Sequence, residues 1–264
     1  SSLKHLSTIK AERDPAYHCQ DHSVKWLITA YYHTGRVSVH AVDNMGVLKQ
    51  QAAFFGETAL NAHGVAATND NRFVYIPHTG PNLIVQFGFD DSTGQLTVLE
   101  NGSLVSPEST GPRHLATHPK KPWLYGDYEQ GNKVVFYEIR PNGLLTTKQL
   151  LSSVPADWPA GKGATARMTL SDDGRFVYVA NRGHNSIAAF KINQRTGTLS
   201  QVGFYATEPN PRSFVISPCG KWLYAGGQDS GTIAIFSRNR RTGVLSRKGT
   251  VGTGKRPWWL QVIE

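Results

Sequence analysis

Residues 111–130 read GPRHLATHPKKPWLYGDYEQ, and this stretch contains two apolar segments that flank a turn. The segments LATHP and PWLY have the composition of short β-strands, and the residues between them are typical of a tight reversal. Arg113, His114, Asp127 and Glu129 stand at the outer ends of these segments, where the free ends of a hairpin meet. The sequence therefore predicts a hairpin that gathers its charged residues at one end.

The hairpin belongs to an internal repeat with two markers. An aromatic residue opens the second strand of each repeat, and its successive positions lie 47, 50, 53 and 46 residues apart: Trp26, Phe73, Trp123, Phe176 and Trp222. A turn glycine follows in each repeat at intervals of 48, 49, 54 and 46 residues: Gly46, Gly94, Gly143, Gly197 and Gly243. Two independent markers with matching periods indicate a repeat architecture.

Each repeat has the pattern of four antiparallel strands. A short first strand leads into an Asn-, Asp- or Gly-containing turn, the aromatic residue opens the second strand, and an alternating third strand such as NSIAAFKI follows. A Thr-Gly or Asn-Gly turn then leads into the fourth strand. Four strands every ~40–50 residues are typical of a β-propeller blade, so we predict an all-β propeller of four-stranded antiparallel blades.

Five full blades are expected between about Pro15 and about Thr253, within a single propeller domain over residues 1–264. An orphan strand, LKHLSTI at residues 3–9, precedes them and is interpreted as the last strand of an earlier blade. Another orphan strand, PWWLQVI at residues 257–263, follows them and is interpreted as the first strand of a further blade. We therefore expect an N-terminal piece of the ring to be missing from this chain; the alternative is that something else covers the open edges.

The composition narrows the classes of partner. The formal charge of +9 favours an acidic partner, but the basic residues are scattered, and RNRR at residues 238–241 is expected to be a solvated turn. No nucleic-acid-binding motif and no apolar run of membrane-spanning length occurs in the sequence. Cys19 and Cys219 are interpreted as reduced thiols. We expect no metal, no cofactor and a cytoplasmic location, although a start without Met leaves a removed signal peptide as an alternative.

The blade topology predicts where a ligand site lies. The start of strand one and the end of strand two share one face of a propeller, at the mouth of its channel, whereas the opposite face receives generic turns such as NDNR and SDDG. One residue after the first-strand start stand Ala16, His63, Arg113, Ala166, Arg212 and Trp258. Six residues after the aromatic stand Tyr32, Thr79, Glu129, Arg182 and Gln228.

We therefore predict one pocket at the channel mouth. Its expected members are the polar residues at these two positions and the histidine beside the first arginine: His63, Arg113, Glu129 and Arg212, with Tyr32, Arg182, Gln228 and His114. An exposed ion pair between Arg113 and Glu129 is the simpler alternative. Three arginines from three blades, however, repel one another unless an anion offsets their charge, and this favours a site for an anionic ligand.

The combined motifs GPRHLATHP, WLYGDYEQGNKVVFYEI, LSDDGRFVYVANRGHNSIAAFKI and PRSFVISPCGKWLYAGGQDSGTIAIF resemble the seven-bladed β-propeller lactonase family. This family includes propeller-type 6-phosphogluconolactonases and 3-carboxy-cis,cis-muconate cyclases, and the resemblance runs from about Leu3 to Glu264. It implies that the N-terminal one to two blades of a seven-bladed ring are missing or incomplete in this chain. It also implies that His63, Arg113, Glu129 and Arg212 are functional residues.

Two departures from the family pattern are visible. The segment ITAYYHTGRVSV resembles a family motif and places Tyr32 at the mouth, but Tyr31 replaces the usual Asn. Arg167 stands where relatives commonly have Asp or Glu, which removes one candidate acid and adds a cation. Because successive strand residues point to opposite sides, we expect Arg167 to point away from the channel axis.

The function expected from these residues is hydrolysis of a sugar-acid lactone, with 6-phosphogluconolactone favoured because the predicted site is strongly cationic. Arg113 and Arg212 would bind a carboxylate or phosphate, His63 or Glu129 would move a proton, and an arginine would stabilise the oxyanion. One alternative is the lactonizing isomerase chemistry of a carboxymuconate cyclase. The other is a propeller without catalytic activity that binds an anionic ligand or partner.

Overall fold

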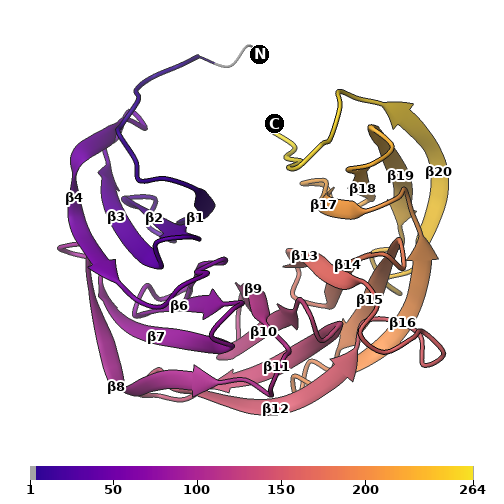
Figure 1. The fold of residues 1–264 in the computed structure, drawn as a ribbon, viewed down its shortest axis with the longest axis horizontal. Coiled ribbons are helices and arrows are strands. Elements are labelled where there is room, and N and C mark those ends of the chain that lie inside the picture. Colours follow the sequence, from indigo (N-terminus) through magenta and orange to yellow (C-terminus); the bar gives the residue numbers. More distant parts are fainter. Residues whose placement is uncertain (1–3, 264) are drawn as a thin grey trace. The chain divides into compact units, whose positions relative to one another are not determined.

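The computed structural model describes residues 4–263 and contains twenty β-strands in five four-stranded sheets. No helix occurs among these residues. Within each sheet the strands follow one another in chain order, as Figure 1 shows for β1–β4 and for β17–β20. The registers of the strand pairs are antiparallel. The predicted all-β class and the predicted four-stranded blades are confirmed, and the five sheets are named blades 1 to 5.

The strands begin close to the residues that the sequence markers indicate. Blade 1 contains β1 (Pro15–Gln20), β2 (Trp26–Tyr31), β3 (Arg36–Val42) and β4 (Leu48–Glu57). Blade 2 contains β5 (Ala66–Ala67), β6 (Phe73–His78), β7 (Leu83–Asp90) and β8 (Gln95–Val105). Blade 3 contains β9 (Pro112–Thr117), β10 (Trp123–Tyr128), β11 (Lys133–Ile139) and β12 (Leu145–Ser152). Blade 4 contains β13 (Ala164–Leu170), β14 (Phe176–Arg182), β15 (Ser186–Ile192) and β16 (Leu199–Ala206). Blade 5 contains β17 (Pro211–Ile216), β18 (Trp222–Gly227), β19 (Thr232–Arg238) and β20 (Leu245–Gly252).

A side-chain hydrogen bond fixes the first turn of four blades. The residue five positions before the aromatic accepts a hydrogen bond from the aromatic's backbone N–H, at 2.8 Å for Asp21 and at 3.1 Å for Thr68, Ser171 and Ser217. Such side chains satisfy backbone groups that a reversal leaves without ladder partners. Each second strand therefore begins at its aromatic residue.

The two sequence markers meet in the contact between consecutive blades. A β-carbon added to Gly94 would lie 2.5 Å from the Trp26 ring of the preceding blade, and one added to Gly143 would lie 2.3 Å from Phe73. Only glycine allows an approach this close. The Tyr75 hydroxyl also donates a hydrogen bond to the Gly143 carbonyl at 2.8 Å. Gly243 meets the marker Phe176 in the same way, while Gly197 meets Phe136 of β11, so the aromatic residues and the glycines share one period because they meet between consecutive blades.

The chain divides into two compact units, residues 1–117 with 139–145 and residues 118–138 with 146–264. The first unit has a core of buried aliphatic and aromatic side chains that includes Ile28, Val39 and Phe87. The second has a core that includes Phe176, Phe214 and Phe236. Blade faces of this kind stabilise the fold by about 1.5–3 kcal/mol for each large apolar side chain that they remove from water.

The expected orphan strands are not strands. Residues 4–14 and 253–263 have no strand assignment, and Leu3 lies outside the described residues. In both segments, backbone N–H groups bond to side chains: Lys10 N donates to Gln50 Oε1 at 3.2 Å, and Leu260 N donates to Ser213 Oγ at 3.0 Å. A strand needs backbone partners at regular intervals, and these contacts do not supply them. The number of blades that complete the ring stays a prediction.

The RNRR cluster also differs from the expectation of a solvated turn. Arg240 and Arg241 are exposed, but Arg238 retains only 5% of its accessible surface. Its Nε donates to the Tyr178 hydroxyl and its Nη1 to the Gly220 carbonyl, both at 2.8 Å. The guanidinium also lies 5.3 Å from the Phe176 ring centroid. Arg238 is therefore a structural residue of the second unit.

Candidate active site

Four of the predicted site residues, Tyr32, His63, Arg113 and His114, belong to the first unit. Tyr32 follows β2, His63 precedes β5, and Arg113 and His114 lie in β9. The His63 N–H donates to the Pro77 carbonyl at 2.9 Å, which holds this loop against β6. A β-carbon on the next residue, Gly64, would lie 2.6 Å from the Arg113 carbonyl. Glycine at this position is what allows the His63 loop to reach β9.

The His63 imidazole packs edge to face against two aromatic rings. Its centroid lies 5.8 Å from Tyr32, with an interplanar angle of 85°, and 5.0 Å from His114, with an angle of 78°. His63 is half-buried, whereas Arg113 and His114 are only 3% and 5% exposed. Ring pairs of this geometry are favourable and limit how an imidazole can turn. The structure thus brings together all four of these predicted residues.

Arg113 contacts His114 directly. Its Nη1 lies 2.9 Å from His114 Nδ1 and 3.3 Å from His114 Nε2. The Nη1 group lies this close to both ring nitrogens, so the guanidinium lies against the imidazole of His114. The buried Arg113 therefore orients the ring against which His63 packs.

The other predicted residues, Glu129, Arg182, Arg212 and Gln228, belong to the second unit. Arg182 Nη2 forms an ion pair with Glu129 Oε1 and donates to the Thr165 carbonyl at 2.7 Å. The side chains of Arg182 and Glu129 are 17% and 18% exposed. Thr165 also donates its N–H to the Glu129 carbonyl at 3.0 Å. Thr165 of β13 therefore contacts the backbone of Glu129 and the side chain of Arg182.

The Arg212 guanidinium experiences the charges of this pair. Burial, and next the like charge of Arg182, lower the pKa of Arg212, while Glu129 partly opposes the shift. Two arginines facing one carboxylate leave an excess of positive charge in a partly buried cluster. An anion placed here would relieve the repulsion between the guanidinium groups.

Two buried polar atoms at predicted site residues of the second unit lack partners within the described chain. Arg182 Nε and Gln228 Oε1 make no hydrogen bond among residues 4–263. Buried polar atoms are normally paired, and those that are not often mark a place where a ligand or water completes the contacts. A phosphorylated polyol offers both an acceptor for Nε and hydroxyl donors for Oε1.

Sequence reasoning did not assign functional roles to two tryptophans that contact arginines of this unit. The Arg212 guanidinium carbon lies 4.3 Å from the Trp258 ring centroid, and that of Arg167 lies 3.9 Å from the Trp259 ring centroid. Trp258 and Trp259 remain 56% and 50% exposed. The sequence offered one signal for such a role, because Trp258 stands one residue after a first-strand start, as the predicted site residues Arg113 and Arg212 do. Exposed pairs of this kind contribute about 0.5–1 kcal/mol each.

Asp127, which stands at the end of the opening hairpin, contacts Thr165, the residue that also holds the Glu129–Arg182 pair. Its side chain is 0% exposed, and its Oδ2 accepts a hydrogen bond from the Thr165 hydroxyl. The position of Asp127 therefore supports a structural role between β10 and β13.

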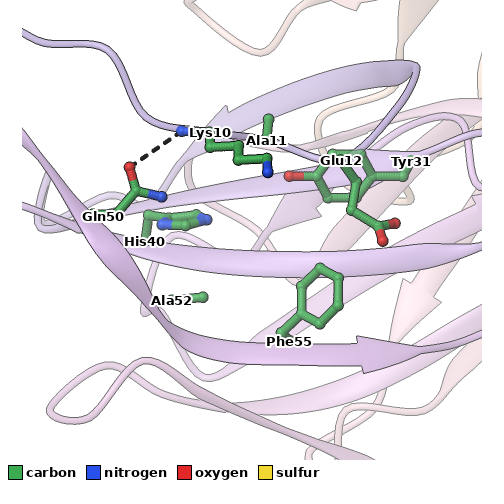
Figure 2. A pocket seen from close by; sticks show the side chains of 8 residues that line it. All are labelled: Lys10, Ala11, Glu12, Tyr31, His40, Gln50, Ala52 and Phe55. Atoms are coloured by element: carbon green, nitrogen blue, oxygen red, sulfur yellow. Dashed lines mark hydrogen bonds between the residues drawn. The ribbon is translucent and has the colours of Figure 1, made fainter.

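An open pocket of about 290 Å³ lies on blade 1 and contains none of these residues. Figure 2 shows its lining, in which the N-terminal segment with Lys10 and Glu12 faces β3 and β4 with His40 and Phe55. Among residues 4–263, no group of three or more His, Cys, Asp or Glu is arranged to hold a metal ion. The same residues contain no helix long and apolar enough to cross a membrane.

The prediction that both clusters line one pocket stays a prediction, because the clusters belong to different units. Each cluster by itself has a recognisable chemistry. The first presents a half-buried imidazole supported by an arginine-bound histidine, and the second presents an excess of guanidinium charge with unpaired polar atoms. A proton-transfer group and an anion-binding group are the parts that lactone hydrolysis needs.

Comparison with known proteins supports the family resemblance. A family model described as "Lactonase, 7-bladed beta-propeller" matches residues 1–262. A 6-phosphogluconolactonase of Bacillus subtilis is 35% identical over 215 residues, which cover 77% of this chain and 60% of the relative. The matched region therefore spans 60% of the length of that curated relative.

Two solved structures are similar over nearly the whole chain. A putative 6-phosphogluconolactonase from Bacteroides fragilis is 26% identical with a TM-score of 0.86, covering 98% of this chain and 76% of that one. Another putative 6-phosphogluconolactonase, from Bacteroides uniformis, is 25% identical with a TM-score of 0.85. The match covers 95% of this chain and 75% of that one. On the fold, the motifs and these matches, the chain belongs to the seven-bladed β-propeller lactonase family.

Proposed function

We propose that this protein hydrolyses the lactone of a phosphorylated sugar acid, 6-phosphogluconolactone, to the open-chain acid. The structural observation that carries the proposal is the group of Arg182, Glu129 and Arg212, in which the two guanidinium groups lie close enough to lower the pKa of Arg212 and suit a phosphorylated anion. The name of the Bacillus subtilis relative supports the same substrate class. Arg182 Nε and Gln228 Oε1 offer further contacts to phosphate and hydroxyl groups.

The reaction consumes one water and needs no other reactant. A base takes a proton from water while the oxygen attacks the lactone carbonyl, and the carbonyl oxygen becomes an oxyanion. The ring C–O bond then breaks and its oxygen receives the proton from the base, which gives a hydroxy acid that releases one proton to solvent as its carboxylate forms. Donors that face the oxyanion contribute most to such catalysis, and a guanidinium is a strong donor.

We assign the proton transfer to His63. Its imidazole is half-buried and is held edge to face between two rings, so it meets water in a restricted orientation. Arg113 acts through His114, which it holds in place, rather than by binding the substrate. Glu129 orients Arg182 instead of moving a proton, because its carboxylate is occupied by that guanidinium.

Hydrolysis of 6-phosphogluconolactone by purified Arg212→Ala tests the anion-binding role. Loss of a charged hydrogen bond of about 1.5–3 kcal/mol predicts a KM that rises ~10- to 100-fold. Arg240→Ala is the matched control, since Arg240 is an exposed arginine outside both clusters. Equal kinetics of the two variants would contradict this role. Binding of the substrate without any turnover by the wild type would favour a propeller that only binds.

We also propose a cytoplasmic location. Cys19 and Cys219 are both free thiols, and thiols persist in reducing compartments. Fractionation of the native cells, with an antibody against the protein, tests this proposal. Recovery in an oxidising compartment would contradict it.

A further inference from the structure

The connection between blades 3 and 4 leads directly to the Glu129–Arg182 pair. It is the longest of the four connections between consecutive blades and comprises residues 153–163, whereas the others comprise residues 58–65, 106–111 and 207–210. It ends one residue before β13, the strand in which Thr165 contacts this pair. The whole connection lies in the second unit, as the pair does. Long connections beside a site often supply contacts to its ligand.

Two side chains hold the backbone of this connection at Lys162. Asn132 Nδ2 and Trp158 Nε1 both donate to the Lys162 carbonyl, at 2.8 Å and 2.9 Å. Asn132 stands in the turn after β10, three residues after Glu129. The backbone at Lys162 is therefore tied to the turn that carries the carboxylate of the pair.

The connection is also tied to the strand end that carries Arg182. A β-carbon added to Gly163 would lie 2.4 Å from the Arg182 carbonyl oxygen, so only glycine allows this approach. The Trp158 ring packs edge to face against His184, two residues after Arg182, at a centroid distance of 4.9 Å. Lys162, which precedes Gly163, is thus held beside both members of the ion pair.

The Lys162 side chain adds a cation to this region. It is exposed, and its ammonium group makes no ion pair among residues 4–263. A lysine is a compact charge on a flexible four-carbon stem, so the position of its backbone determines the region that it reaches. Arg182 and Arg212 already place two guanidinium groups there. A third cation repels them unless an anion offsets the charge.

A buried acceptor lies next to this lysine. Asn132 is only 5% exposed, and its Oδ1 makes no hydrogen bond within the described part of the chain, residues 4–263. Its Nδ2 is already engaged by the Lys162 carbonyl. Buried amide oxygens normally accept a hydrogen bond, and a hydroxyl group of a ligand or a water can donate it. A cation and an acceptor side by side suit a phosphorylated polyol.

We propose that Lys162 binds the phosphate group of the substrate together with the guanidinium groups of Arg182 and Arg212, and thereby sets the preference for a phosphorylated lactone. The inference rests on the proposed function, from which the substrate is taken. The backbone is held in place and the side chain is exposed, so the contact forms without a rearrangement of β13 or β14. The open-chain acid keeps the phosphate group and binds through the same contact.

The first test compares kcat/KM for 6-phosphogluconolactone with kcat/KM for the same lactone without phosphate. Lys162→Met removes the charge from an exposed side chain and leaves the backbone contacts of the connection in place. We expect the ratio of the two kcat/KM values to fall about 3- to 10-fold, the effect of one partly exposed charged contact. Lys162→Arg keeps the cation and should retain most of the ratio.

Lys191→Met is the matched control. Lys191 is an exposed lysine of the same unit, and it pairs with Phe176 at the end of β14 opposite to Arg182. Its ratio should equal that of the wild type. An equal fall in Lys162→Met and Lys191→Met would overturn the inference, because the effect would then come from net charge. An unchanged ratio in Lys162→Met while Arg212→Ala lowers it would also overturn the inference, and the proposed function would stand.

Binding measurements separate this inference from the proposed function. Titration calorimetry with 6-phosphogluconate and with gluconate measures the phosphate contact without turnover. Lys162→Met should weaken the binding of 6-phosphogluconate about 3- to 10-fold and leave that of gluconate unchanged. If this loss occurs in a protein that hydrolyses no lactone, hydrolysis is refuted and the lysine contact is supported. Equal affinity of the wild type and Lys162→Met for 6-phosphogluconate, or no binding by the wild type, overturns the lysine contact.

Discussion

At the scale of single residues, the polar groups of both clusters are positioned by close contacts of their neighbours. Gly64 allows the His63 loop to reach β9, and Thr165 holds both ends of the Glu129–Arg182 pair. The sequence could predict that these residues stand at strand ends, because the aromatic marker fixes the phase of each repeat. It could not predict that Glu129 meets Arg182, since the partners are 53 residues apart and depend on the packing of two blades.

The role of His63 predicts a selective loss of turnover. His63→Gln keeps a polar side chain of similar size but removes the group that accepts the proton from water. We expect kcat for lactone hydrolysis to fall about 10²- to 10⁴-fold with little change in KM, the usual contribution of general base catalysis. Steady-state kinetics measure both constants. An equal change in kcat after His22→Gln, an exposed histidine in the same unit, would contradict the assignment.

A buried histidine outside the clusters predicts a pH-dependent stability. Burial lowers the pKa of His78 to about 4, and its Nδ1 lies 3.2 Å from the Leu60 carbonyl. The unfolded chain takes up the proton near the ordinary pKa of about 6.5, so the native state is fully favoured above that pH and loses stability as the pH falls towards 4. Urea unfolding at pH 7.5 and pH 4.5 should show a smaller loss for His78→Asn than for the wild type. An equal loss in both proteins would remove His78 as the cause.

At the scale of elements, the contact between an aromatic strand and the next glycine turn explains why two sequence markers share one period. The strands and turns could be predicted because each carries a local signal. The end segments at 4–14 and 253–263 could not, because whether a segment pairs as a strand depends on backbone partners that its own sequence does not contain. The burial of Arg238 could not be predicted for a similar reason, because its partners, Tyr178 and Gly220, come from other strands and turns.

This contact predicts a large effect from one methyl group. In Gly143→Ala, the added carbon would lie 2.3 Å from the Phe73 ring, and the residue would keep a left-handed backbone at φ 85°. Strain and overpacking together should lower the free energy of unfolding by about 2–4 kcal/mol. Gly249→Ala is the control, because its added carbon meets nothing within 4 Å. Urea midpoints measure both, and similar midpoints for the two variants would contradict the contact.

At the scale of the whole molecule, repeat counting predicted the five blades, and the motifs predicted the family. The excess of guanidinium charge in the second unit connects the fold to the proposed chemistry, since it favours a substrate with a phosphate group over a neutral one.

The most direct measurement is therefore the ratio of kcat/KM for 6-phosphogluconolactone to kcat/KM for the same lactone without phosphate, with spontaneous hydrolysis subtracted. An arginine–phosphate contact of about 1.5–3 kcal/mol predicts a ratio of ~10 to 100 for the wild type, falling towards one in Arg212→Ala. A wild type that hydrolyses neither lactone above the spontaneous rate, or both with equal kcat/KM, would contradict the account.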